Sequence, residues 1–309
     1  MSLVTIVFAL LLEQLRPVAV DRINGWLAAW SDLLSARFNA GEWRHGVAAW
    51  VIGVALPSAL LLAVYALAFR YSWPLALLLG VAFLYATMGF RQFSHHFTSI
   101  HIALRGGNFA EARRLLTAWR GGSAERLDSG EVARLTIENA LLASHRHVYA
   151  PLFWFAILGP AGALLYRLAC HFCYAWQPKS GDDAEGGKAF GGFARHAFAV
   201  LDWLPVRLTA ISFAVVGNFE DAVYCWRTQS ARWPEAASGI ILSAGAGALG
   251  VRLGMPIDTG SGIVDRPELG VGDDADPDFM QSAVGLVWRS LVMVLLLLTL
   301  LSVARWAGA

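Results

Sequence analysis

The sequence is short of charge. Only 15% of its 309 residues are Asp, Glu, Lys or Arg, whereas soluble domains carry about 25%. The 24 basic and 23 acidic residues nearly cancel, leaving a net charge of +1. Proteins that bind nucleic acid carry an excess of basic residues, and this sequence has no such excess. The shortage of charge argues against an ordinary soluble domain and directs attention to the uncharged stretches.

Cysteine and the common catalytic motifs are also scarce. Cys170 and Cys173 form a C-x-x-C pair, and Cys225 is the third cysteine. A lone pair of this kind favours packing over a redox or metal role, and no histidine spacing matches a metal-ligand motif.

The glycines of Gly245–Gly250 resemble a G-x-G-x-x-G loop, but no strand precedes them, which excludes a dinucleotide site. We find no Walker A motif, nucleophile elbow or kinase motif, and we predict no metal site.

Long uncharged runs are abundant. Four of them are bordered or interrupted by arginine: Val47–Phe69, Trp73–Phe90, Val148–Tyr166, and Ser290–Ala304, which extends back past Arg289 to Ala283. A helix needs about 20 apolar residues to cross the hydrocarbon core of a bilayer. The runs therefore predict an all-α fold, a polytopic helical bundle embedded in the lipid bilayer.

The N-terminus and the charge distribution indicate how the chain is inserted. Met1–Val20 has no basic leader and no small-residue cleavage site, so we interpret it as a short or tilted first membrane helix rather than a signal peptide. The arginines of residues 1–46 and the eight arginines of 91–147 place both segments in the cytoplasm by the positive-inside rule. We expect a multi-pass protein of the cell inner membrane, a single domain over 1–309 with a cytoplasmic helical insertion at 91–147.

Capping signals predict three helices in this insertion. The first covers Arg91–Arg105 and ends at a Gly-Gly pair. Asn108, with Glu111 three residues later, caps a second helix over Ala110–Trp119. Asp128 and Glu131 form another capping box, which begins a third helix running to about Ser144.

The remaining segments are less regular. Gln177–Gly192 is polar and rich in glycine, which predicts a flexible loop. Arg252–Asp278 is rich in Gly, Asp and Pro, and predicts an irregular segment that could order around a ligand. In Phe198–Gly217, Asp202 and Arg207 flank a proline, so they either pair across a kink or both meet a polar ligand.

The cytoplasmic helices carry candidate anion ligands. Arg91, His95 and Arg105 share one helical face, and Glu131, Arg134, Glu138 and His145 share another. If the two faces meet, they form a basic pocket edged by carboxylates that suits a phosphate or carboxylate substrate; the alternative is a solvated surface. The candidates for substrate or anion binding by this reasoning are Arg91, His95, Arg134, His145, Arg146 and Asp202.

Three segments, in order along the chain, carry a family resemblance. They are Pro151–Trp154 with Gly159–Arg167, then Leu204–Thr209, then Ala246–Gly254. Together they resemble the CobD/CbiB family of cobalamin-biosynthesis membrane proteins. The stretch from Gly107 to Ala112-Arg113 is similar to that family's helical loop.

The resemblance implies a reaction and its participants. Members of the family join aminopropanol, or its phosphate, to a carboxylate of adenosylcobyric acid with consumption of ATP, so ATP, Mg²⁺ and a corrinoid substrate are expected. Glu138, Asn139 and Arg207 are the catalytic candidates that it implies, and Thr209 and Arg252 would bind anionic groups. The family's Asp-Gly pair falls on Arg146-His147 when aligned without a gap.

Two other interpretations stay open. Phe153–Phe155 and Gly159–Arg167 also resemble AmpE-like membrane proteins, which implies a sensor that acts through a regulatory protein partner and needs no cofactor. A transporter is a weaker alternative, because the hydropathy shows no inverted repeat. The sequence leaves open whether the protein forms a homodimer.

Overall fold

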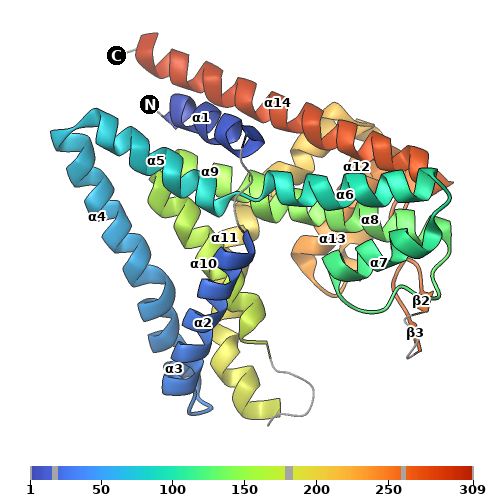
Figure 1. The fold of residues 1–309 in the computed structure, drawn as a ribbon, viewed down its shortest axis with the longest axis horizontal. Coiled ribbons are helices and arrows are strands. Elements are labelled where there is room, and N and C mark those ends of the chain that lie inside the picture. Colours follow the sequence, from blue (N-terminus) through green and yellow to red (C-terminus); the bar gives the residue numbers. More distant parts are fainter. Residues whose placement is uncertain (1, 16–19, 178–183, 259–261, 308–309) are drawn as a thin grey trace. The chain divides into compact units, whose positions relative to one another are not determined.

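The computed structural model describes residues 2–15, 20–177, 184–258 and 262–307 (Figure 1). Within these ranges, side chains are described except those of residues 2–3, 14–15, 20–21, 90–93, 184–189 and 305–307. The chain divides into two compact units. Unit 1 comprises Met1–Gly89 with Arg146–Pro205, and unit 2 comprises Phe90–His145 with Val206–Ala309. Helices dominate both units, which confirms the predicted all-α class.

Unit 1 consists of helices. Its elements in chain order are α1 (Ser2–Leu15), α2 (Val20–Phe38), α3 (Trp43–Trp50), a π-helical turn (Val51–Ala55), α4 (Leu56–Tyr71), α5 (Trp73–Thr87), a second π-helical turn that begins in unit 2 (His145–Tyr149), α9 (Ala150–Leu158), α10 (Pro160–Ala175) and the first part of α11 (Ala184–Val216). Helix α10 packs against α2, α4, α5 and α9. It is therefore the central helix of this unit.

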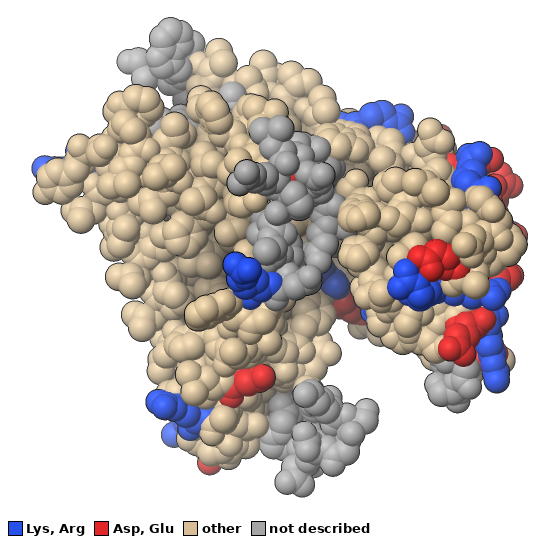
Figure 2. Space-filling view, in the orientation of Figure 1, with Lys and Arg blue, Asp and Glu red and all other residues tan. Residues whose placement is uncertain are grey.

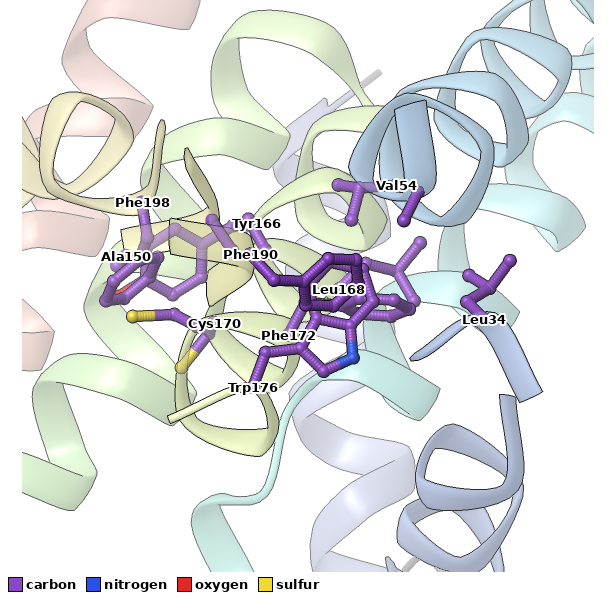
Figure 3. Packing of buried hydrophobic residues seen from close by; sticks show 14 residues of the cluster. Leu34, Val54, Ala150, Tyr166, Leu168, Cys170, Phe172, Trp176, Phe190 and Phe198 are labelled. Atoms are coloured by element: carbon purple, nitrogen blue, oxygen red, sulfur yellow. The ribbon is translucent and has the colours of Figure 1, made fainter. Parts of the chain in front are cut away.

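The core of unit 1 is an aromatic cluster around α10 (Figure 3). Phe172 packs edge-on against Trp176, with 4.6 Å between ring centroids, and Trp176 lies 4.8 Å from Phe190 of α11. Cys170 and Cys173 are buried in the same cluster and form no disulfide. Their place among aromatic side chains agrees with the packing role predicted for the C-x-x-C pair.

One predicted span, Val148–Tyr166, is wrong as a continuous helix. The chain reverses at Gly159, whose φ is +62°, and the span is divided between α9 and α10. The two helices pack closely, because a Cβ on Gly162 would lie 2.1 Å from the carbonyl oxygen of Trp154. Glycine at 162 thus permits a tight helical hairpin where hydropathy alone indicated one crossing.

Unit 2 contains the predicted helical insertion and the C-terminal third of the chain. Its helices are α6 (Phe90–Arg105), α7 (Phe109–Arg120), α8 (Ser129–Ser144), the end of α11, α12 (Phe219–Gln229), a 3₁₀ turn (Ser230–Arg232), α13 (Ala236–Leu249) and α14 (Pro277–Ala307). Helix α8 contacts α6, α7, α13 and α14. It occupies the centre of unit 2.

The caps predicted from the sequence are formed. The side chain of Asn108 accepts from the N–H of Glu111, at 3.2 Å. The side chain of Asp128 accepts from the Glu131 N–H at 2.7 Å, and Glu131 accepts in return from the Asp128 N–H at 2.9 Å. These bonds satisfy amide groups that a helix start leaves without intrahelical partners. All three predicted helices are confirmed to within a residue or two.

Two segments predicted to be irregular have more structure than expected. Helix α11 begins at Ala184, so the C-terminal part of the predicted loop Gln177–Gly192 is helical; residues 178–183 lie outside the described ranges. In Arg252–Asp278, short strand pairs form. Strand β1 (Val251–Arg252) runs parallel to β4 (Asp273–Asp274), and β2 (Ile257–Asp258) runs antiparallel to β3 (Ile263–Val264). Two-residue strands were too short to be predicted from periodicity.

Three helical segments among the described residues are long and apolar enough to cross a membrane: Trp43–Tyr71, Phe190–Val216 and Pro277–Ala304. The first and third contain the predicted spans at Val47–Phe69 and Ser290–Ala304. The second was predicted only as a partly apolar segment, and the predicted span at Trp73–Phe90 is the shorter apolar helix α5. Figure 2 shows few charged side chains over α4 and α5. Large apolar side chains there, such as Leu60 and Leu78, are exposed and suited to lipid.

Candidate anion-binding site

The candidate site is built on α8, where two charged side chains are buried. Arg134 and Glu138 lie four residues apart, hence on one face of the helix. Only 8% of the Arg134 side chain and 6% of the Glu138 side chain are exposed. Removing a charged group from water is costly unless it is paired and hydrogen-bonded, so the partners of these two side chains define the site.

Glu138 is fully engaged. Its Oε2 accepts from Nη1 of Arg266 at 2.7 Å, and its Oε1 accepts from Nη2 of the same guanidinium at 3.3 Å. The backbone N–H of Gly254 donates to Oε1 at 2.9 Å. This bidentate ion pair joins α8 to the segment between β1 and α14. The charged and neutral donors together satisfy the hydrogen-bonding capacity of the buried carboxylate.

Arg266 also fixes the turn at 254–255. It donates to the carbonyl oxygens of Gly254, at 2.8 Å, and Met255, at 3.1 Å, and its guanidinium lies 5.6 Å from the ring centroid of Trp233. Gly254 has φ +76°, and a Cβ there would lie 2.0 Å from the Pro267 carbonyl oxygen. Met255 has φ +63°, a conformation that costs a non-glycine residue about 1 kcal/mol or more. The Glu138–Arg266 pair holds this strained turn against α8.

Arg134 has far fewer partners than its five N–H groups can serve. Its Nη2 donates to the Pro256 carbonyl oxygen at a long 3.5 Å and lies 3.8 Å from a carboxylate oxygen of Glu131. Its Nε is buried without a hydrogen-bond partner among the described residues. A buried guanidinium in this state is the feature of unit 2 that most needs a ligand.

Charges of both signs act on Arg134. Burial lowers the pKa of Arg134, the Arg266 charge lowers it further, and Glu138, Glu131 and Asp128 oppose the shift. Desolvation likewise lowers the pKa of Arg120, with Arg266 adding to the shift and Glu138 opposing it. Glu138 is paired with Arg266, so an anion would supply the hydrogen-bond partners that the buried Arg134 guanidinium lacks, and the exposed Arg120 adds a second cation near Glu138.

A phosphate group fits this arrangement. Guanidinium groups bind phosphate oxygens through paired N–H donors, more strongly than neutral donors do. Magnesium bound with a nucleotide needs only one or two protein carboxylates beside the phosphates and water. No group of three or more metal-ligating side chains occurs in the described part of the chain, and Glu131, at the start of α8, is the nearest carboxylate not held by Arg266. The residues present therefore fit the phosphates of ATP more clearly than they fit a magnesium ion.

Of the charged faces predicted on the helices of residues 91–147, the structure pairs Glu138 with Arg266, outside these helices. His95 is exposed and bonds Ser99, with 3.2 Å between Nδ1 and Oγ, whereas Arg105 pairs with Asp278. The side chain of Arg91 lies outside the described residues. The pocket predicted between His95, Arg105 and the α8 residues is thus wrong as a grouping.

Other predicted site residues lie at separate places. His145 and Thr209 are both buried in unit 2, with 3.0 Å between Nδ1 and Oγ1. Arg252 forms ion pairs with Asp274 at 2.9 Å and Glu268 at 3.8 Å, so it supports the β1–β4 segment. Asn139 follows Glu138 on α8 and is half-buried.

In unit 1, the remaining polar candidates take structural positions. Asp202 is buried and accepts from the Tyr166 hydroxyl at 2.9 Å. The guanidinium of Arg146 lies 4.8 Å from the ring centroid of Tyr174. Arg207, the last of these candidates, belongs to unit 2 and is half-buried on α11, beyond Pro205. Binding roles for these residues and for His95, His145, Thr209, Asn139 and Arg252 stay predictions.

Sequence reasoning missed Arg266 and Arg120. Arg266 lies in a segment without helical or strand periodicity, so nothing in the sequence indicated that it would fold back on Glu138. Two signals were available: the segment was expected to order around a ligand, and Gly254 ends one of the family motifs. Arg120 ends α7 before a glycine pair and could be interpreted only as a C-terminal helix charge.

Cys225 completes the inventory of reactive groups. It is buried on α12, and burial raises the pKa of its thiol to about 11. A thiol in that state is a poor nucleophile at neutral pH. It therefore adds nothing to the chemistry of the site.

Fold and site together define an α-helical membrane protein with a buried, incompletely hydrogen-bonded arginine on a helical subdomain. A family model described as "CobD/Cbib protein" matches residues 6–287. The chain belongs to the CobD/CbiB family, as its motifs predicted.

Curated relatives agree with this assignment. The protein is 34% identical over 278 residues to "Cobalamin biosynthesis protein CobD" of Stutzerimonas stutzeri, a match covering 87% of each chain. It is 36% identical over 239 residues to the protein of the same name from Chromobacterium violaceum, covering 75% of this chain and 74% of the relative. No solved structure matches significantly.

Proposed function

We propose that this protein forms an amide bond in cobalamin assembly, joining aminopropanol or its phosphate to a carboxylate of adenosylcobyric acid with consumption of ATP. The product would be adenosylcobinamide or its phosphate. Family membership and the names of the relatives support a role in cobalamin biosynthesis. The specific ligation is our inference.

The observation that carries the proposal is the buried, under-partnered guanidinium of Arg134. A carboxylate is a poor acyl donor, so amide formation requires its activation, and ATP would supply the phosphoryl group. Cationic side chains preorganised in a buried site stabilise the charge that develops during such a transfer. Arg134 and Arg120 would hold the phosphate oxygens.

Glu138 takes a different part from the one first expected. Both its carboxylate oxygens accept hydrogen bonds, from Arg266 and from the Gly254 N–H. A carboxylate occupied in this way is a positioning residue. It fixes Arg266 and the turn at 254–255 beside Arg134, and it leaves Arg134 free to bind the substrate's anionic group.

We further propose that the protein spans the inner membrane several times and presents the 91–147 segment to the cytoplasm, where ATP and the corrinoid are available. The long apolar helices support membrane insertion. The arginines of residues 91–147 support the orientation.

Complementation tests the proposed reaction. A strain that lacks the amide-forming step is given this chain and scored for cobalamin-dependent growth. We expect growth with the wild-type protein and none with Glu138→Gln or Arg207→Ala. Failure of an expressed, membrane-inserted wild-type protein would refute the enzymatic proposal, and growth with both variants would refute the roles of Glu138 and Arg207.

A second candidate is an AmpE-like membrane sensor that keeps the scaffold without the ligation chemistry. The observation in its favour is the replacement of the family's Asp-Gly pair by Arg146-His147. Arg146 lies on the ring of Tyr174, and His147 accepts from Arg167. A wild-type protein that binds a regulatory partner but fails to complement would support this candidate.

A further inference from the structure

We infer that α7 carries a second ligand site of unit 2, a cavity for a small molecule with a phosphate group at one end and a primary ammonium group at the other. The cavity has a volume of about 360 Å³, within the range of roughly 300–1,000 Å³ that is usual for small-molecule pockets. It is lined by α7 and by the loop that follows this helix. The lining residues are Ala110, Arg113, Arg114, Thr117 and Glu125.

The α7 side of the cavity is one face of the helix. Two arginines and a threonine follow Ala110 by three, four and seven positions, which is the spacing of a single helical face. Of the two arginines, Arg114 is already paired, because its Nε and Nη2 donate to the two carboxylate oxygens of Glu111 at 2.7 and 2.6 Å. Arg114 therefore forms part of the wall with its charge compensated.

Arg113 is the cation available to a ligand. Its Nε donates to the carbonyl oxygen of Leu127 at 2.7 Å, which fixes the guanidinium against the loop. Among the described residues, this side chain forms no other hydrogen bond and no ion pair, and the Thr117 hydroxyl has no hydrogen-bond partner. The remaining N–H groups of Arg113 and the Thr117 hydroxyl can therefore donate together to one tetrahedral anion.

Glu125 supplies the opposite charge. Its carboxylate is exposed and forms no ion pair or hydrogen bond within the described part of the chain. An anion alone would meet one favourable and one unfavourable charge in this cavity, whereas a zwitterion would satisfy both Arg113 and Glu125. No aromatic side chain lines the cavity, so the carboxylate favours a primary ammonium, which donates hydrogen bonds, over a quaternary one.

The amine component of the proposed reaction has this chemistry. Aminopropanol phosphate carries a phosphate ester and a primary amine, so the cavity would hold the amine co-substrate. That identification rests on the proposed function, whereas the site itself does not. The headgroup of phosphatidylethanolamine carries the same two groups, so the experiment separates a soluble ligand from a lipid.

The test is made by titration calorimetry on the full-length protein carrying Arg134→Met, so that the α8 site does not contribute. The protein is held in phosphatidylcholine nanodiscs without ATP or corrinoid. We expect aminopropanol phosphate to bind more tightly than inorganic phosphate or aminopropanol, and Arg113→Gln to weaken its binding about tenfold or more, as the loss of a charged hydrogen bond predicts. In nanodiscs that contain phosphatidylethanolamine, unchanged binding supports a soluble ligand, and loss of binding by competition supports a lipid headgroup.

Glu125→Gln decides the matter if Arg113→Gln does not fold, because the exposed Glu125 side chain has no contact to lose. This variant should bind aminopropanol phosphate several-fold more weakly, while its affinity for inorganic phosphate stays the same or rises. Arg126→Gln is the matched control, since Arg126 pairs with Asp258 at 3.3 Å and does not line the cavity; it should bind as the parent does.

Two results would overturn the inference. One is aminopropanol phosphate binding no more tightly than inorganic phosphate, and the other is parental affinity in both Arg113→Gln and Glu125→Gln. Binding with the expected effects of these variants, in a protein that forms no amide product, would support the site and refute only the proposed reaction.

Discussion

At the scale of single residues, the contrast between Arg134 and Arg266 explains the site. Both guanidinium groups are buried beside Glu138, but Arg266 has four short contacts and Arg134 has none under 3.5 Å. The Glu138–Arg266 ion pair is complete without Arg134, so a purely structural role for the site does not account for Arg134. This contrast supports a structural role for Arg266 and the proposed ligand-binding role for Arg134.

This contrast predicts opposite effects of substitution. Arg134→Met replaces an incompletely hydrogen-bonded buried charge with a shorter, unbranched apolar side chain, so the unfolding temperature should stay the same or rise while ligation falls about 100-fold. Thermal unfolding in detergent and an activity assay measure the two effects. A clear loss of stability with full activity would show that Arg134 is a structural residue.

Substitutions of Glu138 and Arg266 should have non-additive effects on stability. Glu138→Gln leaves a buried guanidinium without its charge partner and should cost about 3 kcal/mol of unfolding free energy, with a similar cost for Arg266→Gln. The loss of unfolding free energy in the double variant should be smaller, by about 1 kcal/mol or more, than the sum of the losses in the two single variants. Denaturation of the four proteins gives this coupling, and additive costs would contradict a direct pair.

At the scale of elements, local sequence signals predicted local structure, but they did not predict the features that depend on tertiary contacts. The caps at Asn108 and Asp128 defined α7 and α8 because capping depends on residues three apart. Hydropathy, by contrast, cannot distinguish one long span from a hairpin of two apolar helices, so it missed the turn at Gly159. The pairing of Glu138 with Arg266 was also inaccessible, since the two residues are 128 positions apart and Arg266 lies in no periodic segment.

The α9–α10 hairpin should depend on Gly162. Gly162→Ala places a methyl group against the backbone carbonyl of Trp154, so we expect a loss of about 1–3 kcal/mol in stability. Gly285→Ala on α14 meets nothing within 4 Å and should be neutral or slightly stabilising. Tryptophan fluorescence during denaturation measures both. Equal effects of the two substitutions would mean that the hairpin is not tightly packed.

At the scale of the whole molecule, the segments at Trp43–Tyr71, Phe190–Val216 and Pro277–Ala304 are long and apolar enough to cross the bilayer, while the capped helices α7 and α8 carry the residues of the proposed site. This division explains why the sequence looked so poor in charge.

The orientation is testable with single cysteines in a chain whose three buried native cysteines are replaced by alanine. Ser123→Cys lies on the exposed turn after α7 and should react with a membrane-impermeant thiol reagent only in inverted membrane vesicles. Tyr71→Cys, on the opposite side of the first long span, should react in intact cells whose outer membrane has been permeabilised. Labelling of both cysteines from the same side would contradict the proposed topology.

The central claim is that the α8 site supports phosphate-dependent amide formation, and a direct assay tests it. Protein in lipid nanodiscs is supplied with adenosylcobyric acid, aminopropanol phosphate, ATP and Mg²⁺, and adenosylcobinamide phosphate is measured by mass spectrometry. We predict product with the wild type and with Arg114→Gln, an exposed arginine of the same unit that pairs with Glu111, and about 100-fold less with Arg134→Met. No product from folded wild-type protein, or undiminished product from Arg134→Met, would contradict the account.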